Sequence, residues 1–202
     1  MGMTVYFLRH GQTAWNMEKR MQGHTDVPLN EEGRRQARAA RAGLPAVELC
    51  LVSPLSRAQE TARLALGDQQ PPMQVEPLLI EQCYGVAEGR SQTAAYEDST
   101  DPLFYYGRAP ERYQPPEGGE SFAELDARAR AFLRGRLLPL EGKCDTVLVA
   151  AHGALLCAVF REVLGTPLSD FWKNLLPHGG LRAMTVQNGQ CRLLDAPPSV
   201  RP

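Results

Sequence analysis

Arginines, histidines and glycines follow three apolar runs of this sequence, and their chemistry suits a bound anion. The residues are Arg9, His10, Gly11, Ser53, Arg57, His152 and Gly153. Arginine offers a planar fork of donors with a permanent charge, and a neutral histidine carries an unprotonated ring nitrogen that can act as a nucleophile. A phosphate monoester carries nearly two negative charges and several acceptor oxygens. The residue types therefore predict a pocket for a phosphate monoester.

Neutral donors for such a pocket lie close to the first run, at Thr13, Asn16 and Gln22. Each signal is weak alone, because a histidine at the end of a strand is more often a surface or hydrogen-bonded core residue. Metal binding is the rival use of histidine, but the four histidines show neither H-x-x-x-H nor H-x-H spacing. The chain also lacks a Walker loop, a G-x-G-x-x-G and a G-x-S-x-G motif. We therefore expect an anion site without a metal.

Alternating strand and helix signals predict an α/β fold that would bring these residues together. Short apolar runs predict strands over Thr4–Leu8, Val47–Val52, Met73–Glu76 and 146–151, followed by a hairpin over 182–194 that turns at Asn188-Gly189. Helical spacing predicts helices over 28–44, over 53–66, from Ser121 onward and over Leu155–Leu164. We expect a three-layer α/β/α sandwich with a mainly parallel sheet and one antiparallel edge strand. Ligands of such sheets bind at the carboxyl ends of the strands, where the three groups of residues would meet.

Residues 85–120 lack this periodicity and are rich in Gly, Pro, Tyr and charged residues. We therefore predict a single domain over 1–202 in which residues 90–120 form a lid-like insertion over the substrate. Aromatic residues gather between Tyr96 and Tyr113, near Arg108 and Arg112, and would set substrate preference. The alternative is a satellite hydrophobic cluster beneath a long loop.

Composition excludes several classes of partner. The 202 residues carry a net charge of −1, so a basic footprint for nucleic acid is absent. The sequence contains neither a membrane-length apolar run nor a cleavable signal pattern at its start. Its five cysteines are odd in number and lack a C-x-x-C pair, which is typical of reduced thiols in the cytoplasm. We expect a small phosphorylated metabolite as the partner, and a homodimer is left open.

Five segments, in order, resemble the histidine phosphatase superfamily of phosphoglycerate mutase-like enzymes: "FLRHGQTAWN", "QGHTDVPLNEEGRRQA", "SPLSRAQETA", "PEGGESFAELDARARAFL" and "VLVAAHGALL". Their combination is far more specific than any one of them, and it spans nearly the whole chain. The resemblance implies that His10 is the nucleophile and becomes phosphorylated. It also implies further phosphate contacts from Arg9, Arg57, His152, Asn16, Gln22 and Thr13.

A sixth segment, "LLIEQCYGVAEGR", is similar to the stretch that carries the acidic proton donor of that family. The resemblance implies that Glu81 is this acid, and Glu88 is the competing carboxylate. Ala87 departs from the pattern, because many members carry tryptophan there. This departure leaves the subfamily open but not the chemistry.

The resemblance leaves three functions open. The first is a phosphomonoester hydrolase that needs no metal or cofactor and is similar to α-ribazole, sugar-phosphate or broad-specificity phosphatases. The second is a phosphoglycerate mutase, an isomerase, and the third is a phosphate-binding module without catalysis. All expected catalytic side chains are present, which argues against the third. A mutase needs cations for a second acidic group, and the spare ones are few: Lys19, Arg20, Arg90, Arg108 and Arg112. We therefore expect water to be the main acceptor.

Overall fold

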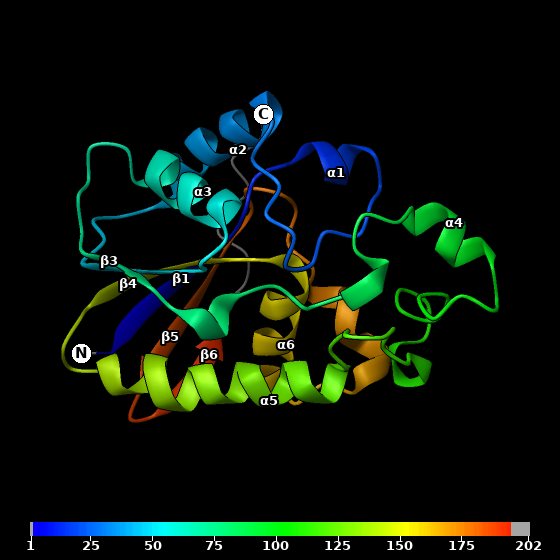
Figure 1. The fold of residues 1–202 in the computed structure, drawn as a ribbon. Coiled ribbons are helices and arrows are strands. Elements are labelled where there is room, and N and C mark those ends of the chain that lie inside the picture. Colours follow the sequence, from blue (N-terminus) through cyan, green and yellow to red (C-terminus); the bar gives the residue numbers. More distant parts are fainter. Residues whose placement is uncertain (1, 195–202) are drawn as a thin grey trace.

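The computed structural model describes residues 2–194 and shows a six-stranded sheet between two layers of helices (Figure 1). The strands are β1 (Met3–Arg9), β2 (Leu49–Val52), β3 (Met73–Val75), β4 (Thr146–Ala151), β5 (Leu181–Gln187) and β6 (Gln190–Leu193). Their order across the sheet is β3-β2-β4-β1-β5-β6, and β3, β2, β4 and β1 are parallel. The predicted three-layer sandwich with a mainly parallel sheet is confirmed.

β1 and β4 lie side by side at the centre of the sheet because both are apolar on both faces. The last five positions of β4 are all buried. The two strands pair in parallel along their length, and the register ends with Arg9 opposite Ala151. This register places the residues that follow each strand, His10 and His152, next to each other.

The antiparallel edge of the sheet is the hairpin of β5 and β6. β5 pairs antiparallel with β1, so that Leu181 lies opposite Leu8. Asn188 and Gly189 adopt φ angles of 54° and 73°, the left-handed pair that a type I′ turn requires. The predicted hairpin is therefore confirmed, and the start of β5 lies at the edge of the sheet where β1 ends.

Helices α2 (Glu31–Ala40) and α3 (Ser56–Leu66) cover one face of the sheet, and α5 (Phe122–Phe132) and α6 (Gly153–Leu164) cover the other (Figure 1). The side chain of Asn30 accepts a hydrogen bond from Gly33 N, and Ser121 and Glu124 form a reciprocal capping box. Caps of this kind stabilise a helix by about 1 kcal/mol each. Within residues 2–194, no helix has both the length and the apolar character needed to cross a bilayer.

Shorter helical segments connect these elements. They are α1 (Ala14–Met17), α4 (Gln92–Glu97), a π-helical turn at Leu133–Leu137, and 3₁₀ turns at Arg41–Gly43, Pro77–Leu79, Gly85–Ala87, Pro110–Arg112, Leu138–Leu140 and Leu168–Asn174. Four residues separate the end of β1 from α1, and Thr13 and Asn16 form a capping box at the start of α1.

Two hydrophobic layers hold the helices against the sheet. In the larger layer the ring of Phe7 on β1 meets the edge of the Phe160 ring on α6, with centroids 5.3 Å apart. In the smaller layer α3 presents alanines to the sheet, namely Ala58, Ala62 and Ala65. Small side chains let a helix pack closely. Arg57, in the first turn of the same helix, is fully buried.

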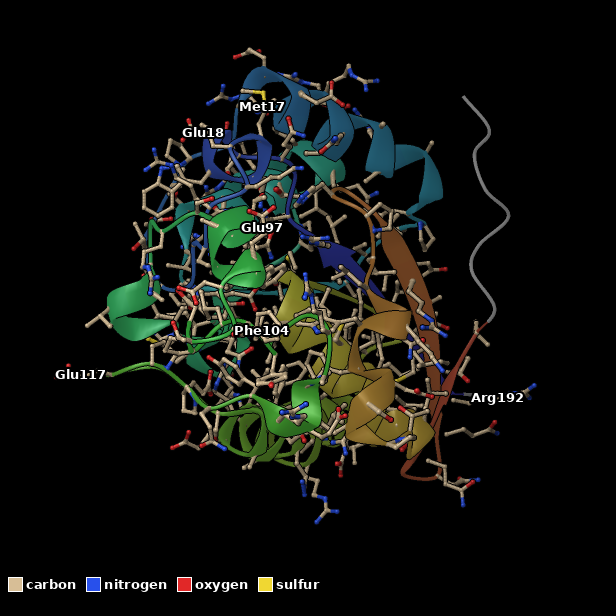
Figure 2. The ribbon with its side chains drawn as sticks, turned by 90° about the vertical axis from the view of Figure 1, so that its right-hand side faces the viewer. Met17, Glu18, Glu97, Phe104, Glu117 and Arg192 are labelled. Atoms are coloured by element: carbon tan, nitrogen blue, oxygen red, sulfur yellow. The ribbon has the colours of Figure 1, made fainter. Side chains whose placement is uncertain are left out.

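Residues 90–120 lie beside the edge of the sheet at which the parallel strands end (Figure 1). Figure 2 faces this side and shows Glu97 of α4 between the end of α1, marked by Met17 and Glu18, and Phe104. The segment is anchored by Tyr106, whose carbonyl accepts a 2.8 Å hydrogen bond from Trp172 Nε1. Tyr106 also packs against the rings of Tyr84, Tyr113, Phe122 and Trp172. The satellite aromatic cluster is therefore present, and the lid function of 90–120 and the single domain over 1–202 stay predictions.

Candidate active site

A cavity of about 340 Å³ opens at the carboxyl ends of the parallel strands. Six of the eight predicted site residues line it: Arg9, His10, Asn16, Gln22, Arg57 and Glu81. The other two, Thr13 and His152, are buried and lie behind the lining residues. The volume is in the range of small-ligand sites in proteins.

His10 is held in a form suited to nucleophilic attack. Its Nδ1 lies 2.7 Å from the carbonyl oxygen of Gly11. A carbonyl can only accept a hydrogen bond, so Nδ1 carries the proton and the lone pair is on Nε2. Burial, followed by the charges of Arg57 and Arg9, holds the pKa of His10 well below its ordinary value. The imidazole is therefore neutral near pH 7.

The turn after His10 depends on glycine because α2 approaches closely. A Cβ atom on Gly11 would lie 2.3 Å from the carbonyl oxygen of Gly33, and one on Gly33 would lie 2.0 Å from the carbonyl oxygen of Gln12. The amide of Gly11 donates to Thr61 Oγ1 on α3 over 3.0 Å. Helices α2 and α3 thus fix the backbone that presents the nucleophile.

Arg9 is a partly buried cation that is held at both of its Nη atoms. Its Nη1 donates to the carbonyl of Leu176 over 2.6 Å, and Nη2 lies 3.5 Å from His178 Nε2. Among the residues described, its Nε has no acceptor. Burial lowers the pKa of Arg9, and the nearby charge of Glu81 opposes this effect.

Arg57, which lines the same cavity, is held in a similar way. Its Nη2 donates to the carbonyl of Gly23 over 2.7 Å, and its Nη1 donates to that of Thr25 over 2.9 Å. Its Nε is also buried and has no acceptor in the part of the chain that the structure describes. Burial lowers the pKa of Arg57, whereas Glu81 and Asp26 raise it. Both guanidiniums line the same cavity, and their remaining N–H donors suit an anion bound between them.

Glu81 lies in the cavity at the start of α6. Its Oε1 accepts hydrogen bonds from the amides of Gln82 (3.0 Å) and Leu155 (3.1 Å), and its Oε2 accepts one from Ala154 (3.3 Å). Ala154 and Leu155 belong to the first turn of α6, whose free amides attract a carboxylate. The carboxylate is thereby fixed beside the residues that would hold phosphate.

Glu88, the competing carboxylate, does not line the cavity. Its oxygens accept hydrogen bonds from the backbone amides of His24, Thr25 and Tyr84. Position alone therefore favours Glu81 as the acid, and its catalytic role stays a prediction.

His152 does not line the cavity, but its ring lies next to that of His10. Its Nε2 lies 2.7 Å from Ser53 Oγ at the end of β2, and its ring centroid lies 5.1 Å from that of His10. Burial, with the charge of Arg57, holds the pKa of His152 well below its ordinary value. Its buried Nδ1 has no partner within residues 2–194. Nδ1 carries the proton in the tautomer in which the Ser53 hydroxyl donates to Nε2.

Thr13 orients two amide side chains rather than facing the cavity. Its hydroxyl oxygen lies 2.9 Å from Gln22 Oε1 and 3.1 Å from Asn16 Oδ1, and its backbone amide donates to the same Asn16 oxygen. Because the two amide oxygens face Thr13, the NH₂ groups of Asn16 and Gln22 are left to donate to an anion. The placement suits an indirect role for Thr13 and direct contacts from the other two.

His178 is a site residue that the sequence interpretation missed. Its ring centroid lies 5.5 Å from that of His10, and burial lowers its pKa to about 4. It precedes β5, and the amide of Gly179 donates to the carbonyl of Arg9 over 3.1 Å. Because β5 runs antiparallel to β1, it begins at the edge of the sheet where β1 ends. The Asn188-Gly189 hairpin predicts that reversed direction, and it is therefore the sequence signal that could have identified His178.

The residues that would face the rest of a substrate also differ in part from those that the sequence indicated. Tyr84, Tyr106 and Trp172 line the cavity, and Arg108 and Arg112 do not. Instead, Arg108 lies over the Phe104 ring and Arg112 over the Tyr105 ring. Lys19 and Arg20 line the cavity from the side of α1.

Comparison with known proteins identifies relatives of this chain. Residues 5–196 match the model of the histidine phosphatase superfamily (branch 1). The chain is 37% identical over 167 residues to the 2,3-bisphosphoglycerate-dependent phosphoglycerate mutase 2 of Gloeobacter violaceus, a match that covers 79% of this chain and 74% of that protein. It is 29% identical over 186 residues to the adenosylcobalamin/α-ribazole phosphatase of Escherichia coli, covering 91% and 90%. The crystal structure of the α-ribazole phosphatase from Shigella flexneri superposes with a TM-score of 0.84 at 26% identity, over 96% of each chain.

Proposed function

Because this chain belongs to branch 1 of the histidine phosphatase superfamily, we propose that it is a phosphomonoester hydrolase that works through a phosphohistidine at His10. One observation carries the proposal. The imidazole of His10 is neutral, its Nδ1 is bonded to the carbonyl of Gly11, and its free nitrogen shares a cavity with the guanidiniums of Arg9 and Arg57 and with Glu81. This set contains a nucleophile, an anion site and a proton donor.

In the first step the phosphate group is held by Arg9 and Arg57, with the amides of Asn16 and Gln22 as further donors. The Nε2 lone pair of His10 attacks phosphorus, an N–P bond forms and the ester P–O bond breaks. Glu81 gives its proton to the departing oxygen, which leaves as an alcohol.

In the second step water replaces the alcohol. Glu81, now a carboxylate, takes a proton from the water as its oxygen attacks phosphorus. The P–N bond breaks, its electron pair returns to Nε2 of His10, and inorganic phosphate leaves. We propose that this chemistry needs no metal or other cofactor, because Arg9 and Arg57 supply the charge that stabilises the transferring group.

The substrate that we propose is a small phosphorylated metabolite. Apart from the phosphate site, the cavity offers an aromatic wall of Tyr84, Tyr106 and Trp172 and a polar rim that includes Lys19 and Gln92. The α-ribazole phosphatase relative, matched over nine-tenths of both chains, supports hydrolysis of such a compound. The five free cysteines support our further proposal of a reducing compartment, the cytoplasm.

A phosphoglycerate mutase is the second candidate, because one relative with that name is 37% identical to this chain. A mutase must hold a second acidic group and protect its phosphohistidine from water. Arg90 pairs with Asp101, which leaves Lys19 and Arg20 as the further cations at the cavity. Arg20 already pairs with Glu18 over 2.8 Å. One remaining lysine supports an acid-bearing substrate better than a doubly phosphorylated intermediate.

The test of the proposed function is a phosphomonoester panel combined with rapid quench. We expect release of inorganic phosphate, with and without chelator, and a trapped intermediate that survives alkali but not acid. His10→Ala should abolish both. Efficient interconversion of 2- and 3-phosphoglycerate that depends on 2,3-bisphosphoglycerate, with little free phosphate, would replace the hydrolase by the mutase.

A further inference from the structure

The carboxylate of Glu88 joins two loops of the active site from outside the cavity. Its Oε1 accepts hydrogen bonds from the amides of His24 (2.9 Å) and Tyr84 (3.2 Å). Its Oε2 accepts from the amide (2.8 Å) and the hydroxyl (2.6 Å) of Thr25. Both oxygens are therefore fully engaged by groups on loop 23–25 and loop 81–88.

Loop 23–25 is the loop that holds Arg57. The two carbonyls that receive the Arg57 guanidinium belong to Gly23 and Thr25, the residues on either side of His24. Gly23 has a φ of +56°, and a Cβ atom there would lie 2.1 Å from Glu88 Oε1. The left-handed glycine thus allows the carboxylate to close over the backbone while the adjacent carbonyls face Arg57.

Loop 81–88 is the loop that carries Glu81. His24 connects it to the first loop a second time, because His24 Nε2 donates to the carbonyl of Glu81 over 2.9 Å. Removing the Glu88 anchor would therefore loosen loop 23–25 first, since three of the four hydrogen bonds described above come from that loop.

The hydrogen bonds also decide the charge of Glu88. Burial raises its pKa, but the bonds from Thr25, His24 and Tyr84 outweigh burial and hold the pKa below its ordinary value. Glu88 is thus a carboxylate at neutral pH and has no proton to donate. A carboxylate that accepts several hydrogen bonds, most of them from backbone amides, is a rigid support.

We propose that Glu88 is a positioning residue for phosphate binding. Its carboxylate fixes loop 23–25, and the carbonyls of Gly23 and Thr25 then hold Arg57 in the geometry that a phosphate group needs. The catalytic consequence rests on the proposed function, whereas the effect on phosphate binding does not.

The test compares Glu88→Gln, Arg57→Ala and the double variant by calorimetric binding of inorganic phosphate and of vanadate. Glutamine keeps the size of the side chain but replaces one acceptor oxygen by an NH₂ group, which would face a donor. Glu141→Gln is the matched control, because Glu141 accepts hydrogen bonds from the amides of Asn188 and Gly189, in a turn away from the cavity.

We expect Glu88→Gln to weaken phosphate binding at least tenfold and to lower kcat/KM on the order of 10²-fold, the size of effect that follows a small misplacement of a binding group. The loss should be the same for alkyl and for activated aryl phosphates, because phosphate binding precedes departure of either group. In the double variant Glu88→Gln should add nothing to Arg57→Ala. Glu141→Gln should bind phosphate like the wild type.

Three results would overturn the inference: unchanged phosphate binding in Glu88→Gln, a loss confined to alkyl phosphates, or effects of Glu88→Gln and Arg57→Ala that add. If Glu88→Gln does not fold, Thr25→Val removes one hydrogen bond of the anchor and keeps the backbone donors. It should weaken phosphate binding several-fold, and wild-type binding in it would equally contradict the proposal. A wild-type protein that binds phosphate but hydrolyses no phosphomonoester would count against the proposed function and not against the role of Glu88 in phosphate binding.

Discussion

Replacing Arg57 by lysine keeps the positive charge of the phosphate site but removes its fork. The guanidinium has five N–H donors, and the carbonyls of Gly23 and Thr25 take one from each Nη. Three donors are left, among them the buried Nε that has no acceptor within the described residues. An ammonium has three donors in all, so one would remain after the same two carbonyls are served.

The magnitude follows from the lost hydrogen bonds. One charge-assisted bond to a phosphate oxygen contributes about 1.5–3 kcal/mol. If one such bond is lost in the transition state, kcat/KM should fall roughly 10- to 150-fold in Arg57→Lys. Arg57→Ala should lose more, because it also leaves two buried carbonyls without a donor.

The assay is steady-state hydrolysis of p-nitrophenyl phosphate alongside thermal unfolding of each variant. Arg63→Lys is the matched control, since Arg63 lies on the same helix, α3, is exposed and donates to Gln59. Full activity of a folded Arg57→Lys, or a loss equal to that of Arg63→Lys, would refute the reasoning.

Three further predictions concern the acid Glu81, the rim residue Lys19 and the histidine His178. Glu81→Gln should slow alkyl phosphates on the order of 10²- to 10⁴-fold and p-nitrophenyl phosphate far less, because a nitrophenolate barely needs a proton; equal losses would assign Glu81 a binding role. Lys19→Gln should lower kcat/KM for 3-phosphoglycerate relative to glycerol 3-phosphate about fivefold, the worth of one exposed ion pair, and Lys143→Gln should leave the ratio unchanged. Lowering the pH from 7 to 4 should reduce the free energy of unfolding, because the unfolded chain protonates His178 near 6.5 while its folded pKa is about 4. The unfolded chain then binds more protons, and this histidine alone contributes on the order of 3 kcal/mol. Urea titrations of His178→Gln should show a shallower pH dependence, and an unchanged one would contradict the buried neutral histidine.

The central part of the fold could be predicted because its signals are local. The continuous apolar runs of β1 and β4 identify strands covered on both faces, and parallel pairing then brings His10 and His152 to one edge. The helix caps at Asn30 and Ser121 and the turn at Asn188 rest on chemistry within a few residues.

The remaining features depend on contacts between distant segments. Glu81 and Glu88 are alike in sequence, and the structure separates them because one faces the start of α6 and the other closes over loop 23–25. His178 reaches the cavity because β5 runs antiparallel to β1; the Asn188-Gly189 turn predicts this reversal, but the place where β5 begins depends on its pairing with the distant β1. The aromatic wall contains Tyr106 because that side chain packs in the cluster with Phe122 and Trp172, while its neighbour Tyr105 instead contacts Arg112.

Among the described residues, nine buried side-chain polar atoms lack a hydrogen-bond partner, and four of the nine belong to side chains in or beside the cavity. Within residues 2–194, the buried atoms that lack one include Arg9 Nε, Arg57 Nε, His152 Nδ1 and His178 Nδ1, four atoms from side chains in or beside one cavity. Each such group costs about 1–3 kcal/mol in an otherwise satisfied interior. A phosphoryl group would supply acceptors for such donors, and the carbonyls of Gly23 and Thr25 already hold the Arg57 guanidinium in place. The same donors need no reorganisation when charge shifts toward the leaving oxygen, which is the property that electrostatic catalysis requires.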